Sequence, residues 1–429
     1  MNKRQVYVVD GARSPFLKAR GKRGVFSASD LAVHAGRSLL IRQPFSASDL
    51  DEVIMGCVMP EPDEVNIARI IALRLGCGDY VPAWTVQRNC ASGMQAIDAA
   101  RLKIMSGESD LVLAGGTEAM SRAPLQLRPE MVDWLAAWWR ARSLGGKLSL
   151  LKKMKLGFLA PVITLLKGLS DPIVGLSMGQ TAENLAHRFH ITRTEMDSFA
   201  VASHQKVEAA VEKKWLDEIV PIISNTGQIY ANDDGVRGDS TVEKLGTLRS
   251  VFDKIYGLVT AGNSAQVTDG AAMLLLASDD AVKKYKLPVL GTIDDVQWSA
   301  LAPEQMGLGP AYAIPPLLKR NQLGIDDIDA WEINEAFATQ VQANLLALND
   351  DDFCKQALGL DAALGNIAED KLNREGGAIA IGHPVGASGA RIVLHLLESM
   401  KRNQEKQGVA AICIGGGQGG AVLLSGGKS

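Results

Sequence analysis

The chain has 429 residues and a formal net charge of −3, with 47% hydrophobic and 22% charged residues. This length and composition are typical of a soluble globular protein with more than one core, and the charge balance excludes a general attraction to nucleic acid. The five cysteines are odd in number and widely spaced, so we expect neither a disulfide framework nor a metal site. A cytoplasmic location fits this cysteine usage.

The N-terminal segment resembles the start of a folded domain. Residues Gln5–Asp10 form a β-branched run followed by a turn, unlike a signal peptide or a transit peptide. No uncharged apolar run approaches the roughly 20 residues needed to span a bilayer. We therefore expect a soluble protein that contacts a membrane at most peripherally.

Strand-like and helix-like segments alternate in the first part of the chain, as in a parallel sheet covered by helices. The expected strands are Val6–Val9, Glu52–Gly56, Thr85–Gln87 and Leu111–Ala114. The expected helices between them are Ser29–Leu40, Asn66–Leu75 and Gly93–Ser106. This order predicts an α/β fold.

Residues 121–250 interrupt this alternation and differ in charge. Between Ser121 and Leu176, nine Lys and Arg stand against three Asp and Glu, a net charge of +6 in a chain that carries −3 overall. Three tryptophans at positions 134, 138 and 139 are spaced to share one helical face, and a charged helix is expected over Arg193–Lys214. We predict a mostly helical inserted loop domain over residues 121–250.

The last part of the chain repeats the plan of the first. Strands are expected at Val289–Asp294, Ala330–Ile333 and Val409–Ile414, and helices at Ala336–Leu348 and Gly386–Lys401. Residues 89–94 resemble 382–389, and residues 110–117 resemble 410–417, which indicates an internal duplication. The predicted halves are 1–120 with 251–284, and 285–429. If they pack as twins, Cys90 faces His383.

Cys90 is placed like a covalent nucleophile. It follows an expected strand and a polar turn, and it precedes a helix whose N-terminus would stabilise a thiolate. The small residues Ala91, Ser92 and Gly93 leave room for a substrate. A lone cysteine is more often an inert small hydrophobe, so the assignment depends on the other motifs.

Three further motifs supply partners for this thiol. Asn334 begins Asn-Glu-Ala-Phe-Ala, His383 lies between glycines before an expected helix, and Cys413 begins Cys-Ile-Gly-Gly-Gly. Taken singly, they could be a helix cap, a structural histidine and a core cysteine. Together they supply a nucleophile, an imidazole base, a second thiol for proton transfer and amide donors for an oxyanion. This combination predicts Claisen chemistry.

These motifs resemble those of the thiolases, in order from Val6 to the C-terminus. So do Val259-Thr-Ala-Gly-Asn263 with Asp269-Gly-Ala, and the segment Met306–Pro315. The resemblance implies an α/β, thiolase-like fold: two duplicated βαβαβαββ halves in stacked α/β layers, with an inserted loop domain. It also implies a homodimer or a homotetramer.

The resemblance assigns a role to each catalytic position. Cys90 would take up the acyl group, and His383 would activate Cys90 and hold the thioester oxygen of the CoA substrate. Asn334 would position a water beside His383, and Cys413 would be the acid and base at the enolate carbon. The backbone N–H groups of Cys90 and Gly415 would hold the acyl carbonyl. We expect nearby dipoles and His383 to bring the thiol pKa values towards ambient pH.

Coenzyme A and acetyl-CoA are implied as substrates, with no permanently bound cofactor. The positions that match the family's CoA contacts are Ser177, Met178, Arg237, Ala336 and Phe337. One position departs from the family pattern, because Ala265 stands where a serine is usual. Ser264 beside it is the remaining candidate for that contact.

The implied activity is that of an acyltransferase: thiolysis of 3-ketoacyl-CoA to acetyl-CoA and a shortened acyl-CoA, as in fatty-acid β-oxidation. The alternative is that the enzyme works mainly in the reverse direction and condenses two acetyl-CoA to acetoacetyl-CoA. A decarboxylating ketoacyl synthase would lack the second cysteine, and a non-enzymatic CoA or lipid-transfer protein would not need the full set of reactive residues.

The basic segment 121–176 resembles the longer insertion in the thiolase subunit of fatty-acid oxidation complexes. Three interpretations stay open: a hairpin on a membrane surface, a docking surface for a hydratase/dehydrogenase subunit, and a lid or oligomer contact with the tryptophans in a core.

Overall fold

The structure is a computed structural model that describes residues 4–427, with a ten-stranded mixed sheet at its centre. The order along this sheet is β12-β13-β14-β11-β1-β10-β5-β3-β4, and β2 pairs with β10. The strands are β1 (Tyr7–Arg13), β2 (Leu17–Lys18), β3 (Glu52–Gly56), β4 (Ala83–Val86), β5 (Leu111–Ala119), β10 (Thr268–Ala277), β11 (Gly291–Ala300), β12 (Ala330–Ile333), β13 (Gln407–Ile414) and β14 (Gln418–Gly426).

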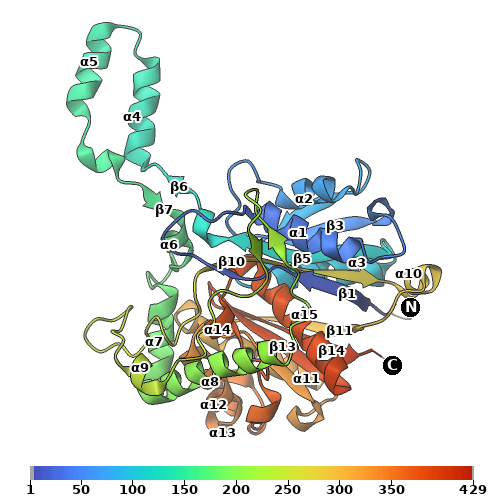
Figure 1. Ribbon diagram of the computed structural model, residues 1–429. Helices are drawn as coiled ribbons and strands as arrows, with labels where there is room; N and C mark the ends of the chain where they lie inside the picture. Colours follow the sequence, from blue (N-terminus) through green and yellow to red (C-terminus); the bar gives the residue numbers. More distant parts are fainter. Residues whose placement is uncertain (1–3, 428–429) are drawn as a thin grey trace.

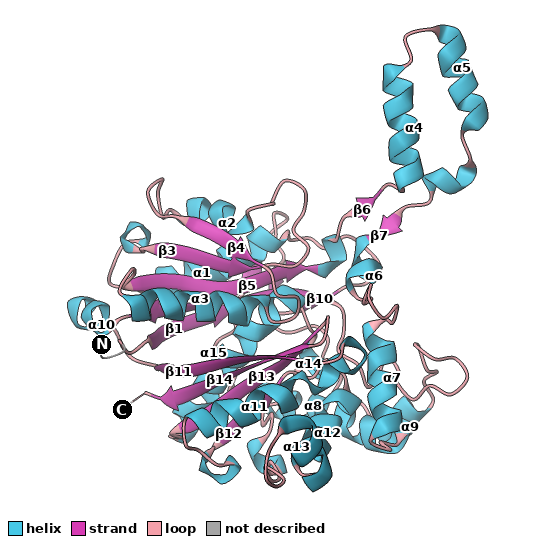
Figure 2. Cartoon of the chain, turned by 180° about the vertical axis from the view of Figure 1, so that it is seen from behind, coloured by secondary structure: helices cyan, strands magenta, loops and turns pink. Residues whose placement is uncertain are grey.

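Helices cover both faces of this sheet (Figures 1 and 2). The body helices are α1 (Ala28–Leu40), α2 (Ile67–Leu75), α3 (Ser92–Ser106), α10 (Asp279–Tyr285), α11 (Gly309–Arg320), α12 (Ala338–Leu348), α13 (Asp351–Leu358), α14 (Ala378–Ile381) and α15 (Val385–Asn403). Three apolar cores separate the layers: one beneath α1 and α2, one around α3 and α15, and one beneath α11 and α12.

Strand β5 shows how the layers are built. Leu111 and Leu113 belong to the core beneath α1 and α2, whereas Val112 and Ala114 belong to the core around α3 and α15. Successive side chains of a strand point to opposite faces, so a strand buried on both faces reads as a continuous apolar run. The predicted α/β layers, with helices on both sides of the strands, are confirmed.

The expectation of a parallel sheet is only partly correct. Parallel pairing joins β3 to β4 and β5, and β12 to β13, whereas the other pairs are antiparallel. The antiparallel pairs come largely from β10 and β14, which the sequence analysis did not predict. The first half of each strand contains glycine and alanine, which have low strand propensity. Both strands are stabilised by pairing with strands distant in the sequence.

The two related helices α3 and α15 pack against each other in the central layer. A Cβ added to Gly93 would lie 2.9 Å from the carbonyl oxygen of Gly386, and one added to Gly389 would lie 2.7 Å from the backbone nitrogen of Met94. Only glycine permits so close an approach of two backbones. Since Cys90 precedes α3 and His383 precedes α15, this packing brings both residues to the same region.

A buried charge cluster fixes the middle of α15. His395 lies between two carboxylates, with Nδ1 3.0 Å from Glu218 and Nε2 3.3 Å from Glu375. Burial alone would lower the pKa of His395, but these carboxylates outweigh burial and raise it to about 10. The protonated imidazole therefore ties α15 to two loops and helps to fix the direction of its catalytic end.

The inserted segment has two parts. Helices α4 (Pro129–Arg140) and α5 (Leu144–Lys153) form a hairpin that stands away from the body on a neck made by β6 (Leu125–Gln126) and β7 (Val162–Ile163), as both views show (Figures 1 and 2). The second part contacts the body and comprises α6 (Thr164–Gly168), α7 (Met178–Arg188), α8 (Arg193–Glu212), β8 (Ile222–Ile223), β9 (Ile229–Tyr230) and α9 (Val242–Gly246).

The inserted segment is mostly helical, but the domain boundaries at 120, 250 and 284 stay a prediction, and the ends of the ranges 1–120 and 285–429 lie outside the described residues. The three tryptophans do not share one face, because Trp134 stacks on Trp138 at 5.3 Å whereas Trp139 is 83% exposed. Between residues 4 and 427, none of the helices combines the length and the apolar character needed to traverse a bilayer.

Candidate active site

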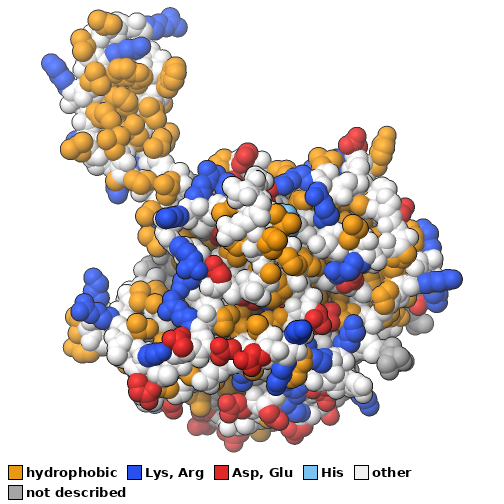
Figure 3. All heavy atoms as spheres, in the orientation of Figure 1, with side chains coloured by type: hydrophobic (Ala, Val, Ile, Leu, Met, Phe, Trp, Pro, Cys, Tyr) orange, Lys and Arg blue, Asp and Glu red, His pale blue; other side chains and the backbone are white. Residues whose placement is uncertain are grey.

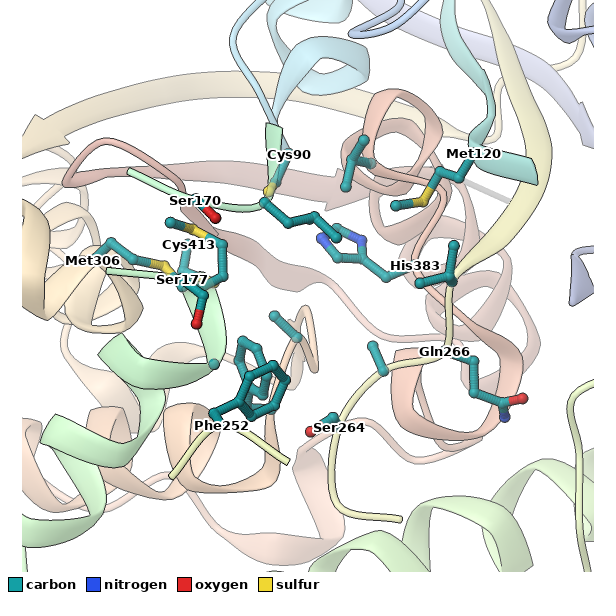
Figure 4. A pocket seen from close by; sticks show the side chains of 18 of the residues that line it. Cys90, Met120, Ser170, Ser177, Phe252, Ser264, Gln266, Met306, His383 and Cys413 are labelled. Carbon is teal, nitrogen blue, oxygen red and sulfur yellow. The ribbon is translucent and has the colours of Figure 1, made fainter. Parts of the chain in front are cut away.

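A cavity of about 430 Å³ brings together most of the predicted site residues. Cys90, His383 and Cys413 project into it from three different elements, as Figure 4 shows. The predicted CoA contacts that also line this catalytic cavity are Ser177, Met178, Ser264, Ala336 and Phe337. The cavity therefore joins the ends of α3 and β13, the loop before α15, and the inserted segment.

The turn before α3 holds Cys90 at the cavity wall. Asn89 adopts a left-handed conformation with φ of +43°, which asparagine tolerates better than most residues. Its side-chain Nδ2 donates to the carbonyl oxygen of Gly415 at 2.8 Å. The hydroxyl of Ser92 accepts from the Arg88 N–H at 2.8 Å and donates to the Asn89 carbonyl oxygen at 2.7 Å. Asn89 thus links the nucleophile turn to the glycine loop after Cys413.

Both thiols are held in the protonated state, which corrects the expectation of pKa values close to ambient pH. Burial raises the pKa of Cys90, although hydrogen bonds from the Gly415 N–H and its own N–H partly offset the rise. Burial also raises the pKa of Cys413, and a charge on the nearby Cys90 raises it further. The helix N-terminus is a weaker influence than desolvation here, so Cys90 needs a base to react.

His383 is suited to be that base. The Ser388 hydroxyl lies 2.6 Å from Nδ1 of His383 and donates its proton to the Pro384 carbonyl oxygen at 3.1 Å. Since the hydroxyl proton is used there, Nδ1 carries the ring proton and donates it to Ser388. Burial, with a smaller contribution from the charge of Arg391, lowers the pKa of His383 to about 3. The ring is therefore neutral, and its Nε2 lone pair is free to accept a proton.

Replacing Ser388 with alanine should lower kcat about 10- to 100-fold while changing KM little. The variant loses the group that fixes the tautomer and orientation of His383, but it keeps the cavity. Steady-state kinetics with acetoacetyl-CoA and CoA measure the effect, and circular dichroism checks the fold. An unchanged kcat in a folded variant would show that Ser388 does not orient the base.

Asn334 and Gly415 lie close to the cavity without being among its lining residues. Asn334 follows β12, and its N–H donates at 2.9 Å to the carbonyl oxygen of Ala411, two residues before Cys413. Both polar atoms of its buried side chain lack a partner among the described residues, as does Nε2 of His383. Buried polar groups normally find a partner, so these atoms are suited to hold a water or a substrate oxygen.

The glycine loop after Cys413 leaves little space for a side chain at Gly415. A Cβ added to Gly415 would lie 3.2 Å from the sulfur of Met178. Together with the hydrogen bond from its N–H to the Cys90 sulfur, this places the Gly415 amide where the carbonyl of an acyl group on Cys90 would lie.

Arg237 lies apart from the other predicted contacts. Its side chain is exposed and does not line the catalytic cavity, and its backbone N–H donates to His204 Nδ1 at 3.1 Å. Its assignment as a CoA contact stays a prediction. Other lining residues were not predicted, because apolar side chains such as Phe252 and Met306 carry no chemical signal in a sequence.

Comparison with known proteins decides the family. The family model described as "Thiolase, N-terminal domain" matches residues 6–280, and "Thiolase, C-terminal domain" matches residues 287–426. The chain belongs to the thiolase family. Thiolases are acyltransferases, and the catalytic cavity of this thiolase holds the two sulfurs and the imidazole that such chemistry needs. Within residues 4–427, no cluster of three or more His, Cys, Asp or Glu is arranged to hold a metal ion.

Individual relatives cover nearly the whole chain. The human protein named "Trifunctional enzyme subunit beta, mitochondrial" is 36% identical over 424 residues, covering 99% of this thiolase and 89% of the relative. A "3-ketoacyl-CoA thiolase" of Yersinia pestis is also 36% identical over 424 residues, with 98% and 96% covered. The crystal structure of human mitochondrial 3-ketoacyl-CoA thiolase in complex with CoA matches with a TM-score of 0.84 and 37% identity, over 99% and 98% of the two chains.

Proposed function

We propose that this thiolase cleaves 3-ketoacyl-CoA with CoA, giving acetyl-CoA and an acyl-CoA shortened by two carbons, within fatty-acid β-oxidation. One observation carries the proposal: two thiols and a neutral imidazole, whose Nε2 has no partner among the described residues, meet in one cavity. The relative from Yersinia pestis named as a 3-ketoacyl-CoA thiolase, similar over almost its full length, supports the same activity.

In the first step, Nε2 of His383 takes the proton of Cys90 as its sulfur attacks the keto carbonyl carbon. The bond between C2 and C3 of the substrate then breaks, and its electron pair goes to the enolate of acetyl-CoA. The thiol of Cys413 protonates C2 of this enolate, and acetyl-CoA leaves. The shortened acyl group remains on Cys90 as a thioester.

In the second step, the thiol of CoA attacks the acyl group on Cys90. The thiol proton of CoA passes to the Cys413 thiolate left by the first step. Cys90 leaves as the product acyl-CoA forms, and protonated His383 returns its proton to the Cys90 sulfur. This second step exchanges one thioester for another, so it is close to balanced in free energy, and every step of the cycle can also run in reverse. The same residues would therefore support the alternative, condensation of two acetyl-CoA to acetoacetyl-CoA.

Two sets of donors stabilise the charge that develops on oxygen. The N–H groups of Cys90 and Gly415 would hold the oxyanion formed at the acyl carbonyl, and His383 with a water on Asn334 would hold the enolate oxygen. Donors preorganised in a dry site typically contribute about 3 kcal/mol each to lowering the barrier. The catalytic cavity is predominantly apolar, which strengthens such interactions.

Coenzyme A would enter along the inserted segment. We propose that Ser177, Met178, Ser264 and Phe337 contact the pantetheine arm, because they line the catalytic cavity on the side opened by α7. A CoA-dependent decrease of the absorbance of acetoacetyl-CoA tests the activity. A correctly folded protein that consumes neither acetoacetyl-CoA nor a longer 3-ketoacyl-CoA would refute the proposal.

We further propose that the α4–α5 hairpin lies on an anionic membrane surface. Figure 3 shows an apolar face on this hairpin with basic side chains at its margins. Exposed apolar residues on the hairpin include Val132, Trp139, Leu144, Leu148 and Leu151, and residues 121–176 carry a net charge of +6. Apolar side chains with a basic rim favour insertion at the headgroup level of anionic lipids. The hairpin projects away from the body, which disfavours a lid over the catalytic cavity.

Replacing Trp139 and Leu144 together with serine should lower binding to phosphatidylglycerol vesicles at least about tenfold. Co-sedimentation with vesicles of phosphatidylglycerol and of phosphatidylcholine measures the effect. Tyr80→Ser is the matched control, because Tyr80 is 99% exposed but lies on the body between α2 and β4. Equal binding of the double variant and the control would exclude the membrane role and leave a contact with a hydratase/dehydrogenase subunit or with a second copy of this chain.

For location and assembly we propose a cytoplasmic homodimer or homotetramer. All five cysteines are free, as in a reducing compartment. The relative named as a trifunctional enzyme beta subunit supports membership of a larger complex, for which co-purification with a hydratase/dehydrogenase is the direct test.

A further inference from the structure

A second cavity adjoins the catalytic cavity at the neck of the hairpin. This outer cavity has a volume of about 740 Å³, larger than the 430 Å³ of the catalytic cavity. Met120 and Val267 line both cavities, so the two spaces meet at these two apolar side chains. On the catalytic side of this junction, Leu166 and Leu169 continue the apolar wall.

The wall of the outer cavity is largely built by apolar residues of the neck. They are Ala123, Pro124, Leu125, Ile163 and Leu165. Leu125 and Ile163 are paired across β6 and β7 and are 67% and 45% exposed. The Thr164 hydroxyl also bonds to the Pro124 carbonyl oxygen, which fixes the two sides of the neck together. Exposed apolar side chains grouped around a hollow are typical of a ligand-binding surface.

Three of the four charged residues that line the outer cavity are paired, whereas Lys22 is exposed and forms no ion pair among the described residues. Arg23 and Arg122 both form ion pairs with Glu61, the latter at 2.8 Å. The hydroxyl of Ser121 is bonded to Asp269. Apart from the exposed Lys22, the surface left free for a ligand is therefore mainly hydrocarbon.

The position of the outer cavity matches the direction in which an acyl group must extend. Figure 4 shows Ser177 and Met120 on opposite sides of His383. In the proposed binding mode, the pantetheine arm of the substrate passes Ser177 and the keto carbonyl reaches Cys90. The acyl chain then extends beyond His383. A four-carbon substrate ends within the catalytic cavity, whereas a longer chain must continue past Met120.

We propose that the outer cavity binds the distal part of a long acyl chain, so that this thiolase prefers long-chain 3-ketoacyl-CoA. The inference rests on the proposed function and adds the substrate class. The chain passes Met120 and lies against the neck residues. Each methylene that leaves water for this surface raises affinity about fourfold.

The experiment compares kcat/KM for 3-ketohexadecanoyl-CoA with kcat/KM for acetoacetyl-CoA. Ala123→Trp fills the outer cavity, and Leu165→Gln is a second variant that makes its wall polar without adding bulk. Ala362→Trp is the matched control, because Ala362 is exposed in a loop and lines neither cavity. The full-length protein is used throughout, below the critical micelle concentration of the long substrate.

Wild type and Ala362→Trp should prefer the long substrate, and the ratio of long to short kcat/KM should fall at least about tenfold in Ala123→Trp and Leu165→Gln. A ratio equal to that of the wild type in folded variants would overturn the inference, as would a wild type that prefers acetoacetyl-CoA. Failure of the wild type to turn over either substrate would instead refute the proposed function, so the two failures are distinguishable.

Discussion

Replacing Cys90 with alanine should lower kcat of thiolysis at least about 10⁴-fold. The sulfur of Cys90 is the atom that carries the acyl group, and no other side chain of the catalytic cavity combines a thiol with hydrogen bonds from two backbone amides. The measurement is the CoA-dependent consumption of a 3-ketoacyl-CoA, followed by absorbance with the variant at high enzyme concentration.

Cys77→Ala is the matched control for this change. Cys77 is a buried free cysteine in the core beneath α1 and α2, and it does not line the catalytic cavity. Its kcat should stay within about twofold of the wild-type value, although a cavity in the core lowers stability. Substantial activity in Cys90→Ala would contradict the assignment of the nucleophile.

Replacing Cys413 with alanine should separate the two halves of the reaction. Cleavage of 3-ketoacyl-CoA should slow about 10²- to 10⁴-fold, because the enolate of acetyl-CoA loses its proton donor. Exchange of labelled CoA into acyl-CoA should continue at a rate within about tenfold of the wild-type rate, because that exchange needs Cys90 and His383 and forms no carbanion. Steady-state cleavage and isotope exchange are measured on the same preparation.

The control for Cys413 is Cys354→Ala, which removes a buried thiol on α13 that hydrogen-bonds to the carbonyl oxygens of Ala347 and Leu348 and does not line the catalytic cavity. Both rates should be close to wild type in this variant. Equal losses of cleavage and exchange in Cys413→Ala would show that Cys413 supports the shape of the cavity and does not move a proton to or from carbon.

Most of the reactive residues in the catalytic cavity could be predicted because each of them belongs to a short sequence motif. Cys90, His383 and Cys413 each stand at the end of a strand or the start of a helix, where parallel layers bring chain ends to one edge. The duplicated motifs also predict that Cys90 faces His383 if the halves pack as twins, and both residues line one cavity beside the close approach of α3 and α15.

Other features depend on contacts between distant segments, which a sequence does not display. Strands β10 and β14 gain their stability from pairing on both sides, so their weak local propensity was misleading. The sign of the pKa shift at Cys90 depends on how deeply the fold buries the thiol, and desolvation exceeded the effect of the helix. Ser388 and His383 both lie within the duplicated residues 382–389, but the hydrogen bond between them became visible only in the structure, as a 2.6 Å contact.

The packing within the α4–α5 hairpin is another feature that the sequence could not predict. The basic charge and the tryptophan spacing of residues 121–176 indicated an unusual surface, but they left a lid, a membrane contact and a partner contact equally open. The stacking of Trp134 on Trp138 and the exposure of Trp139 depend on how α4 and α5 pair, which is a property of the folded hairpin.

The most direct test of the account is to trap the acyl group on the enzyme. The protein is mixed with a 3-ketoacyl-CoA in the absence of CoA, quenched with acid, digested and analysed by mass spectrometry. The peptide that contains Cys90 should gain the mass of the shortened acyl group, and added CoA should remove this group at least as fast as kcat. An acyl group on another residue, or turnover without any acylated Cys90, would contradict the mechanism.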